Sequence, residues 1–179
     1  MTVAPPRAAA EDDRTFTAFF EAHYHPALRL AALLTGNAGQ AEDVVCDAFA
    51  KVYARWRRGG VDDVEAYLRR AVVNTLRSKW RRRALETRKD ASVRVAAGTP
   101  HASAGFESGV VERDAVWAAL DRLPAGQRRV VVLRYYEDLS EAEVAQLLDI
   151  APGTVKSQGS GGLMALQQML APMGAQEGE

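Results

Sequence analysis

Apolar side chains recur every three or four residues over most of this chain, and runs that alternate between apolar and polar residues are absent. That spacing is the period of an amphipathic helix, whereas a half-buried strand has a period of two. The helical period is lost over residues 88–110, which are rich in Ala, Ser, Gly and Thr, as is typical of a linker. The sequence therefore predicts an all-α fold of two small helical domains, 15–87 and 111–170, joined by a flexible linker. Residues 1–14 are expected to be a disordered N-terminal tail and residues 171–179 a C-terminal tail.

Three helices are expected in the first domain. The first begins near Thr15, is expected to break near Pro26, and stops at Gly36. The second, residues 41–57, has acidic side chains near its positive N-terminal end and an apolar stripe along one face. The stripe consists of Val44, Val45, Ala48, Phe49, Val52 and Trp56. Cys46, the chain's single cysteine, is expected to be a small buried hydrophobic residue rather than a redox sensor.

The third helix of this domain, residues 63–83, has two distinct faces at helical spacing. The face expected to point toward the core consists of Val64, Leu68, Ala71, Val72 and Thr75. The second face consists of Arg70, Asn74, Arg77 and Arg81. One helix can therefore pack on its neighbours while it offers guanidinium groups to a phosphate backbone.

The distribution of charge supports a localised contact with a polyanion. The net charge of the whole chain is zero, but residues 51–89 hold 13 Lys or Arg against 4 Asp or Glu, a local net charge of +9. Residues 1–50 sum to −4 and residues 90–179 to −5. A basic block in an otherwise acidic chain is typical of nucleic-acid binding. A merely solvated charged helix is the alternative.

The second domain contains the pattern of a helix-turn-helix. Pro124 is expected at a first helical position. Ser140 followed by Glu143 forms a capping box that defines the start of a short helix. Residues 149–151 leave room for a tight turn before Pro152 opens the next helix. In such a motif the second helix enters the major groove of DNA.

Other functional classes find little support in the sequence. There are no paired carboxylates with a supporting His, no nucleophile motif and no glycine loop with Walker spacing, so no catalytic residue, cofactor or metal is expected. His101 has no partner at metal-ligand spacing and is expected to be solvated. No apolar run has the length of a membrane span or of a signal-peptide core, so a cytoplasmic protein is expected.

Three segments, in this order, resemble the bacterial sigma factors of the extracytoplasmic-function group, closest to their actinobacterial branch. These are "AEDVVCDAFAKVYARW", "YLRRAVVNTLRSKWRRR" and "LDRLPAGQRRVVVLRYYEDLSEAEVAQLLDIAPGTVKS". The resemblance implies a sigma-two and a sigma-four domain that dock on core RNA polymerase and direct promoter recognition, melting and transcription initiation. The implied partners are the clamp helices of the largest subunit, the flap of the beta subunit, promoter DNA and an anti-sigma factor.

The resemblance also implies roles for residues of the first domain. The helix 41–57 resembles the segment that grips the clamp helices, with Asp43, Asp47, Phe49 and Val52 as contact candidates, although the apolar residues must also serve the domain's own core. The helix 63–83 resembles the one that opens the minus-ten element, and the loop before it resembles the loop that captures an unpaired base. The candidates for minus-ten contacts are Arg70, Asn74, Arg77, Lys79, Trp80, Arg81 and Arg82. Trp80 could stack on a base or pack against its own domain.

In the second domain the resemblance implies recognition of the minus-thirty-five element. The candidate contacts are Arg128, Thr154, Lys156, Ser157, Gln158 and Ser160. Lys156 would meet a phosphate, and its neighbours would touch base edges. The family usually carries further basic residues after this stretch, but Lys156 is the last cation in this chain and residues 111–170 hold 6 basic against 8 acidic residues. We therefore expect this domain to hold DNA weakly by itself.

The same helix contains three glycines, Gly159, Gly161 and Gly162, each of which lowers intrinsic helix stability by roughly 1 kcal/mol relative to alanine. In one explanation the glycines allow close approach to the backbone or to a neighbouring helix, while the N-terminal end of the helix reads the groove. In the other, minus-thirty-five recognition is degraded. The second explanation leaves promoter binding to the basic helix or to a helper protein.

A second function class remains open. The helix-turn-helix could be the sole functional unit of a repressor or activator that acts without polymerase, with the N-terminal helices as a dimerisation scaffold. That reading predicts binding to a palindromic duplex. It leaves the basic helix without a role.

Overall fold

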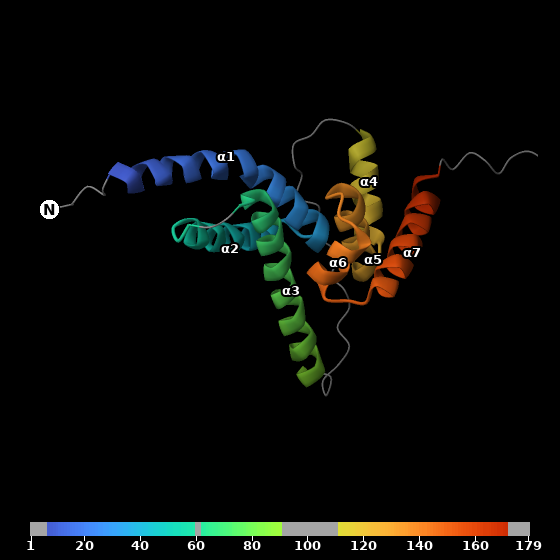
Figure 1. Cartoon of the computed structure of the whole chain (residues 1–179). Coiled ribbons are helices and arrows are strands. Elements are labelled where there is room, and N and C mark those ends of the chain that lie inside the picture. The colour runs from blue at the N-terminus through green and yellow to red at the C-terminus, as the bar shows by residue number, and fades with distance from the viewer. Residues whose placement is uncertain (1–6, 60–61, 91–110, 172–179) are drawn as a thin grey trace, which may run out of the picture. The chain divides into compact units, whose positions relative to one another are not determined.

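The computed structural model describes residues 7–59, 62–90 and 111–171, and their regular structure is entirely helical (Figure 1). The elements are α1 (Arg7–Thr35), α2 (Ala38–Trp56), α3 (Val64–Asp90), α4 (Val111–Arg122), α5 (Ala125–Val131), the π-helical turn η1 (Val132–Tyr136), α6 (Glu141–Leu148) and α7 (Pro152–Leu170). The predicted all-α fold is confirmed. None of the described helices has the length and apolar character needed to cross a membrane.

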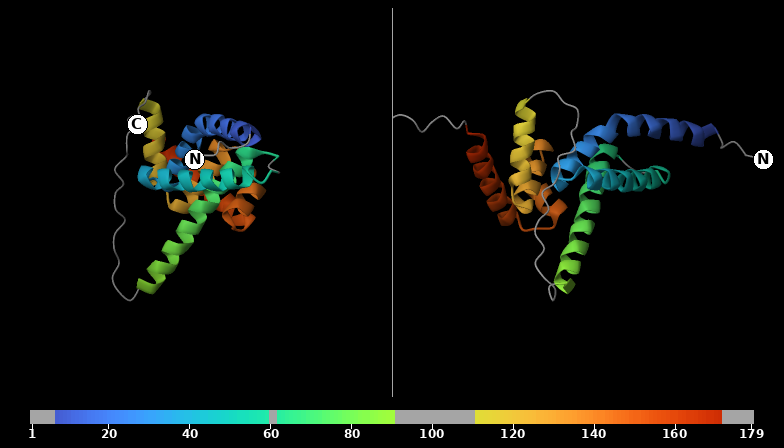
Figure 2. Two further views of the ribbon diagram at one scale, coloured as in Figure 1. Left: turned by 90° about the vertical axis from the view of Figure 1, so that its left-hand side faces the viewer. Right: turned by 180° about the vertical axis from the view of Figure 1, so that it is seen from behind.

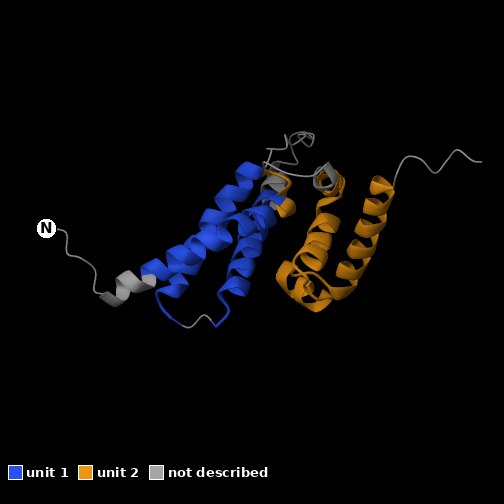
Figure 3. Ribbon diagram, turned by 90° about the horizontal axis from the view of Figure 1, so that it is seen from above, with its two compact units in different colours: residues 1–32, 38–100 blue, residues 33–37, 101–179 orange. Residues whose placement is uncertain are grey.

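The chain forms two compact units (Figure 3). Unit 1 comprises residues 1–32 and 38–100, and unit 2 comprises residues 33–37 and 101–179. Residues 88–90 of the predicted linker form the end of α3, and the rest of it, with His101, lies outside the described residues. The predicted C-terminal tail also lies outside them, except for residue 171.

The N-terminal helix differs from its prediction at two places. It begins at Arg7, so residues 7–14 of the predicted tail are helical. It also continues through Pro26 to Thr35, so the predicted break is wrong. A proline inside a helix removes one backbone hydrogen bond and bends the axis without having to end the helix. Figure 1 shows α1 changing direction part-way along its length.

The core of unit 1 is aliphatic where α2 meets α3. The buried side of α2 consists of Ala41, Val44, Val45, Ala48, Phe49 and Val52. Leu68, Ala71, Val72, Val73, Thr75 and Leu76 are buried on α3. The C-terminal half of α3 extends beyond α2 in both views of Figure 2.

Cys46 is exposed, so the prediction that it is buried is wrong. The buried positions of α2 include 44, 45, 48 and 49, which leaves residue 46 on the outward side of the helix. The spacing of the stripe itself could have placed the thiol outside. Cysteine is generally buried in proteins, but here the helical spacing decides its position.

Unit 2 is built around α5, whose Val130 and Val131 are buried together with Val132 and Leu133 of η1. Pro124 occupies the N-cap of α5 rather than the predicted first helical position. The π-helical turn that follows was not predicted, because hydrophobic periodicity does not distinguish a single π turn from α-helix. These elements position α6 and α7, which form the predicted helix-turn-helix.

Candidate nucleic-acid and polymerase interfaces

The two faces predicted for α3 are separated in the structure. On the core side Thr75 is 4% exposed, and Leu68, Ala71 and Val72 are also buried, while Val64 is half-buried. On the other side Arg70, Asn74, Arg81 and Arg82 are exposed, whereas Arg77, Lys79 and Trp80 are half-buried. We call the set Arg70, Asn74, Arg77 and Arg81 the cationic face. It presents three guanidinium groups and one amide along about three helical turns, the residue types suited to phosphate and base contacts.

Two polar contacts join α2 to α3 beside the aliphatic core. The ammonium of Lys51 donates a hydrogen bond to Thr75 Oγ1 at 2.6 Å. One helical turn further along, Lys79 Nζ lies 3.7 Å from Asp47 Oδ2. Lys51 was not among the predicted site residues. Its position four residues after Asp47, on the same side of α2, could have indicated from the sequence that Lys51 also faces α3.

The four polymerase-contact candidates on α2 fall into two groups, exposed and buried. Asp43 and Asp47 are exposed. Val52 is fully buried, and Phe49 is only 4% exposed. The ring of Phe49 packs against those of Phe19 and Phe20 at centroid distances of 6.2 and 4.7 Å. Phe49 and Val52 therefore belong to the core of unit 1, and the carboxylates are the candidates that remain on its surface.

The two ends of the loop before α3 are held by polar contacts. At its start, Asp13 Oδ1 accepts hydrogen bonds from the Tyr53 hydroxyl at 2.9 Å and from Arg57 Nη1 at 3.3 Å. At its end, Asp63 Oδ1 accepts a hydrogen bond from the backbone N–H of Ala66 at 2.8 Å, which caps α3. Residues 60–61, between these contacts, lie outside the described residues.

The first turn of α3 is also tied to α1. Nε2 of His23 lies 3.3 Å from a carboxylate oxygen of Glu65. The imidazole stacks on Phe19 at a centroid distance of 4.3 Å. Neither contact was predicted from the sequence. The His23–Glu65 contact depends on the packing of α1 on α3, whereas Phe19 and His23 are four residues apart on α1, a spacing that brings side chains together on one helix face.

The helix-turn-helix of unit 2 has the predicted local chemistry. Ser140 and Glu143 form a reciprocal capping box, with the Glu143 N–H donating to Ser140 Oγ at 3.2 Å and the Ser140 N–H donating to Glu143 Oε2 at 2.8 Å. Asp149 ends α6 in the left-handed conformation at φ 58°. The turn then leads to Pro152, the first residue of α7.

The residues of α7 predicted to contact DNA differ in their exposure. Lys156, Ser157 and Ser160 are exposed, whereas Thr154 and Gln158 are half-buried. Ser160 Oγ donates to the Lys156 carbonyl at 3.0 Å, and Ser157 Oγ donates to the Thr154 carbonyl at 3.1 Å. These serine hydroxyls retain acceptor capacity toward a ligand.

The glycines of α7 form the side of the helix that packs on α5. A Cβ added at Gly162 would lie 2.6 Å from Val131 Cγ2, and one added at Gly159 would lie 3.5 Å from Val130 Cγ1. Gly161 faces the Gln127 side chain, with a Cβ distance of 3.0 Å to its amide nitrogen. These distances fit the explanation that the glycines allow a neighbouring helix to approach closely. Groove reading by the end of the helix stays a prediction.

Gln158 takes part in the same close packing from the opposite direction. A Cβ added at Gly126 of α5 would lie 2.8 Å from Gln158 Nε2. Gln127 of α5 covers Gly161 and Gly162 of α7 in the same manner. Each helix therefore places a glutamine over a glycine of the other, and the Gln158 amide is directed toward α5.

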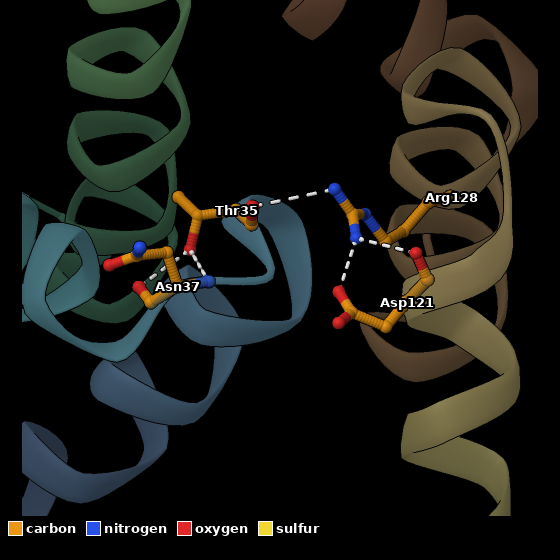
Figure 4. Close-up of polar contacts among 4 residues, drawn as sticks. All are labelled: Thr35, Asn37, Asp121 and Arg128. Carbon is orange, nitrogen blue, oxygen red and sulfur yellow. Dashed lines mark hydrogen bonds and ion pairs between the residues drawn. The ribbon is translucent and has the colours of Figure 1, made fainter. Parts of the chain in front are cut away.

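The arginines before the capping box contact their own unit. Arg128 Nη1 lies 2.6 Å from Asp121 Oδ1, as an ion pair between α5 and α4 (Figure 4). The pKa of Arg129 is lowered to about 10, mainly by burial and to a smaller extent by repulsion from Arg128. Arg134 Nη1 donates to the Leu139 carbonyl, and its guanidinium lies 5.8 Å from the centroid of the Tyr135 ring.

Comparisons with known proteins agree with this geometry. Residues 19–86 match the family described as sigma-70 region 2, and residues 113–166 match sigma-70 region 4. A relative named RNA polymerase sigma-E factor, from Streptomyces antibioticus, is 35% identical over 136 residues, covering 73% of this chain and 70% of the relative. The ECF RNA polymerase sigma factor SigL of Mycobacterium tuberculosis is 32% identical over 171 residues, covering 93% of this chain and 95% of the relative. The chain belongs to the extracytoplasmic-function sigma factors.

A solved structure has the same fold. It is that of the sigma factor RpoE in complex with the anti-sigma factor NepR from Bartonella quintana, with a TM-score of 0.63, 24% identity, and coverage of 88% of this sigma factor and 97% of that chain. The region 2 match contains the cationic face and the acidic side of α2. The region 4 match contains Arg128 and the reading residues of α7.

Proposed function

We propose that this sigma factor joins core RNA polymerase through the outward side of α2 and opens promoters with the cationic face of α3. The observation that carries the proposal is the separation of faces on α3. Its aliphatic side and Thr75 are buried in unit 1, while Arg70, Asn74 and Arg81 are exposed. A helix fixed by one face and cationic on the other can hold a separated strand without disturbing its own fold.

Strand opening of this kind needs no catalytic group, so we propose no enzymatic activity. It requires cations along the strand and a surface on which an unpaired base can stack. The Arg side chains of α3, Arg82 included, supply the cations, and Lys79 is a weaker candidate because it is paired with Asp47. Trp80 is half-buried, and its indole is the aromatic group proposed for this stacking.

The proposed polymerase contact rests on Asp43 and Asp47. Both carboxylates are exposed on α2, and a basic partner surface would complement them. Since Phe49 and Val52 are buried, their proposed role is limited to the shape of unit 1. Unit 2 would dock on the flap of the beta subunit, as the family resemblance implies.

Unit 2 is proposed to supply a weak contact with the minus-thirty-five element. Exposed Lys156 would meet a phosphate, and Thr154, Ser157 and Ser160 would face the groove from the N-terminal half of α7. Arg128 is paired with Asp121 and Gln158 is directed toward α5, so both are weaker candidates than the sequence alone suggested. With so few cations available, most of the phosphate-dependent affinity would come from unit 1.

The proposed setting is the cytoplasm, where RNA polymerase acts. The solved relative is bound to an anti-sigma factor, and a protein of that class is a proposed partner here also.

Transcription from a genomic promoter library tests the proposed function. Purified core polymerase would be assayed with and without the chain, and we expect a defined set of promoters to become active only when the chain is present. If the chain leaves transcription unchanged and instead binds palindromic duplexes without polymerase, the helix-turn-helix regulator is the better description.

A further inference from the structure

The contact between Lys51 and Thr75 is unusual for its surroundings. Among the side chains that the structure describes, Thr75 is the one buried polar residue, at 4% exposure. The other buried side chains of α2 and α3 are Ala, Val and Leu, together with Phe49. The hydroxyl accepts a 2.6 Å hydrogen bond from the ammonium of Lys51, a residue that remains exposed to solvent.

The contact lies on the helix that carries the cationic face. Thr75 directly follows Asn74 in sequence, and Arg70 and Arg77 are within five residues of it. A shift of α3 by one residue rotates every side chain by about 100° around the helix axis. Such a shift would move Asn74 toward the core and change which groups face a DNA strand.

Aliphatic packing alone does not fix how α3 is rotated about its own axis. Interfaces of Val, Leu and Ala tolerate alternative packing arrangements of similar energy, so they lose a unique arrangement before they lose stability. A directional polar contact in an apolar interface selects one register among these arrangements. The Asp47–Lys79 pair, one turn away on both helices, lies in the same antiparallel alignment, but it is exposed to solvent and contributes little.

We propose that Lys51 is a positioning residue for promoter opening, which sets the rotation of α3 through Thr75. This inference deepens the proposed function and rests on it. Lys51 would not need to touch DNA. Because Lys51 is an exposed residue whose ammonium can be rehydrated, removal of the Thr75 hydroxyl would alter the rotation of α3 more than the stability of unit 1.

Replacement of Thr75 tests the proposal without changing the charge of the protein. Thr75→Val removes the hydroxyl and keeps the shape, whereas Thr75→Ser keeps the hydroxyl. Opening would be measured by permanganate reactivity of unpaired thymines on a promoter that the wild-type holoenzyme opens. Core affinity and the thermal midpoint of the full chain would be measured in parallel.

We expect Thr75→Val to reduce opening about three- to tenfold, the effect of losing one net hydrogen bond, with core affinity and thermal midpoint unchanged. Thr75→Ser should retain opening. Lys51→Met should reproduce the loss. The double variant Lys51→Met/Thr75→Val should be no worse than the more severe single variant, since both remove the same contact.

Two results would overturn the proposal. One is normal opening by Thr75→Val. The other is a parallel fall in opening, core affinity and thermal midpoint that Thr75→Ser does not prevent, which would mean a purely structural role. Failure of the wild-type chain to support transcription with core polymerase would instead reject the proposed function, so the two failures are distinguishable.

Discussion

Gly162→Ala should destabilise unit 2 even though alanine is the better helix former. The added Cβ would lie 2.6 Å from Val131 Cγ2 and 3.3 Å from Gln127 Cβ. Optimal carbon–carbon contacts are about 3.5–4.0 Å, so the first contact is about 1 Å too short. Val131 is 5% exposed and branched at Cβ, so it cannot swing away and the two helices must separate.

The magnitude follows from two opposing terms. Overpacking a well-packed interior costs about 1–3 kcal/mol. Replacing glycine with alanine in a helix interior stabilises the helix by about 1 kcal/mol through its higher helix propensity. We therefore expect a net destabilisation of about 1 kcal/mol, equivalent to a roughly fivefold change in the ratio of folded to unfolded molecules.

Gly159→Ala is the matched control on the same helix. Its Cβ would lie 3.5 Å from Val130 Cγ1, an ordinary van der Waals distance, so the propensity gain should dominate. We expect stabilisation by about 0.5–1 kcal/mol. Both substitutions replace glycine with alanine on the same helix, but their effects on the free energy of unfolding should have opposite signs.

Hydrogen exchange of peptides from α5 and α7 in the full chain measures both effects, with α2 and α3 as internal references. Protection should fall about fivefold in Gly162→Ala and rise in Gly159→Ala. Equal gains in protection for both variants would refute the close packing of α5 on α7 as the reason for the glycines.

Three further predictions concern separate parts of the molecule. Replacing both Asp43 and Asp47 by Lys should weaken core polymerase association about tenfold or more, measured by competition binding, and unchanged affinity would reject this contact. Lys156→Ala should lower the salt slope of promoter binding by about one if the ammonium meets a phosphate, whereas Arg128→Ala should leave that slope unchanged because Arg128 is paired with Asp121. Ser140→Ala should cost about 1 kcal/mol of stability by removing the capping box, measured as reduced protection of α6, and full protection would show that the cap contributes little.

Periodicity and capping chemistry predicted the order of the helices and the two faces of α3, but not the start and continuity of α1 or the π-helical turn. The split of α3 into a core side and a cationic side follows from residue spacing alone, because every Cβ on a helix has a fixed direction. The start of α6 at the Ser140 capping box likewise depends on residues three apart in the chain. Local rules of this kind need no knowledge of the tertiary structure.

The contacts that could not be predicted from the sequence join side chains on different helices. Arg128 looked available for DNA until the structure placed Asp121 beside it. Gln158 looked like a reading residue, but Gly126 on α5 leaves a space that its amide fills. Phe49 and Val52 were correctly placed on the apolar stripe, yet the stripe could not be divided between the core and a partner without the positions of α1 and α3.

The most direct measurement is promoter opening by holoenzyme reconstituted with Arg77→Ala/Arg81→Ala, followed by permanganate reactivity alongside core affinity. If the cationic face handles the separated strand, opening should fall well below wild type while binding to core polymerase is retained. Equal loss of opening and core binding, or undiminished opening, would contradict that role for α3.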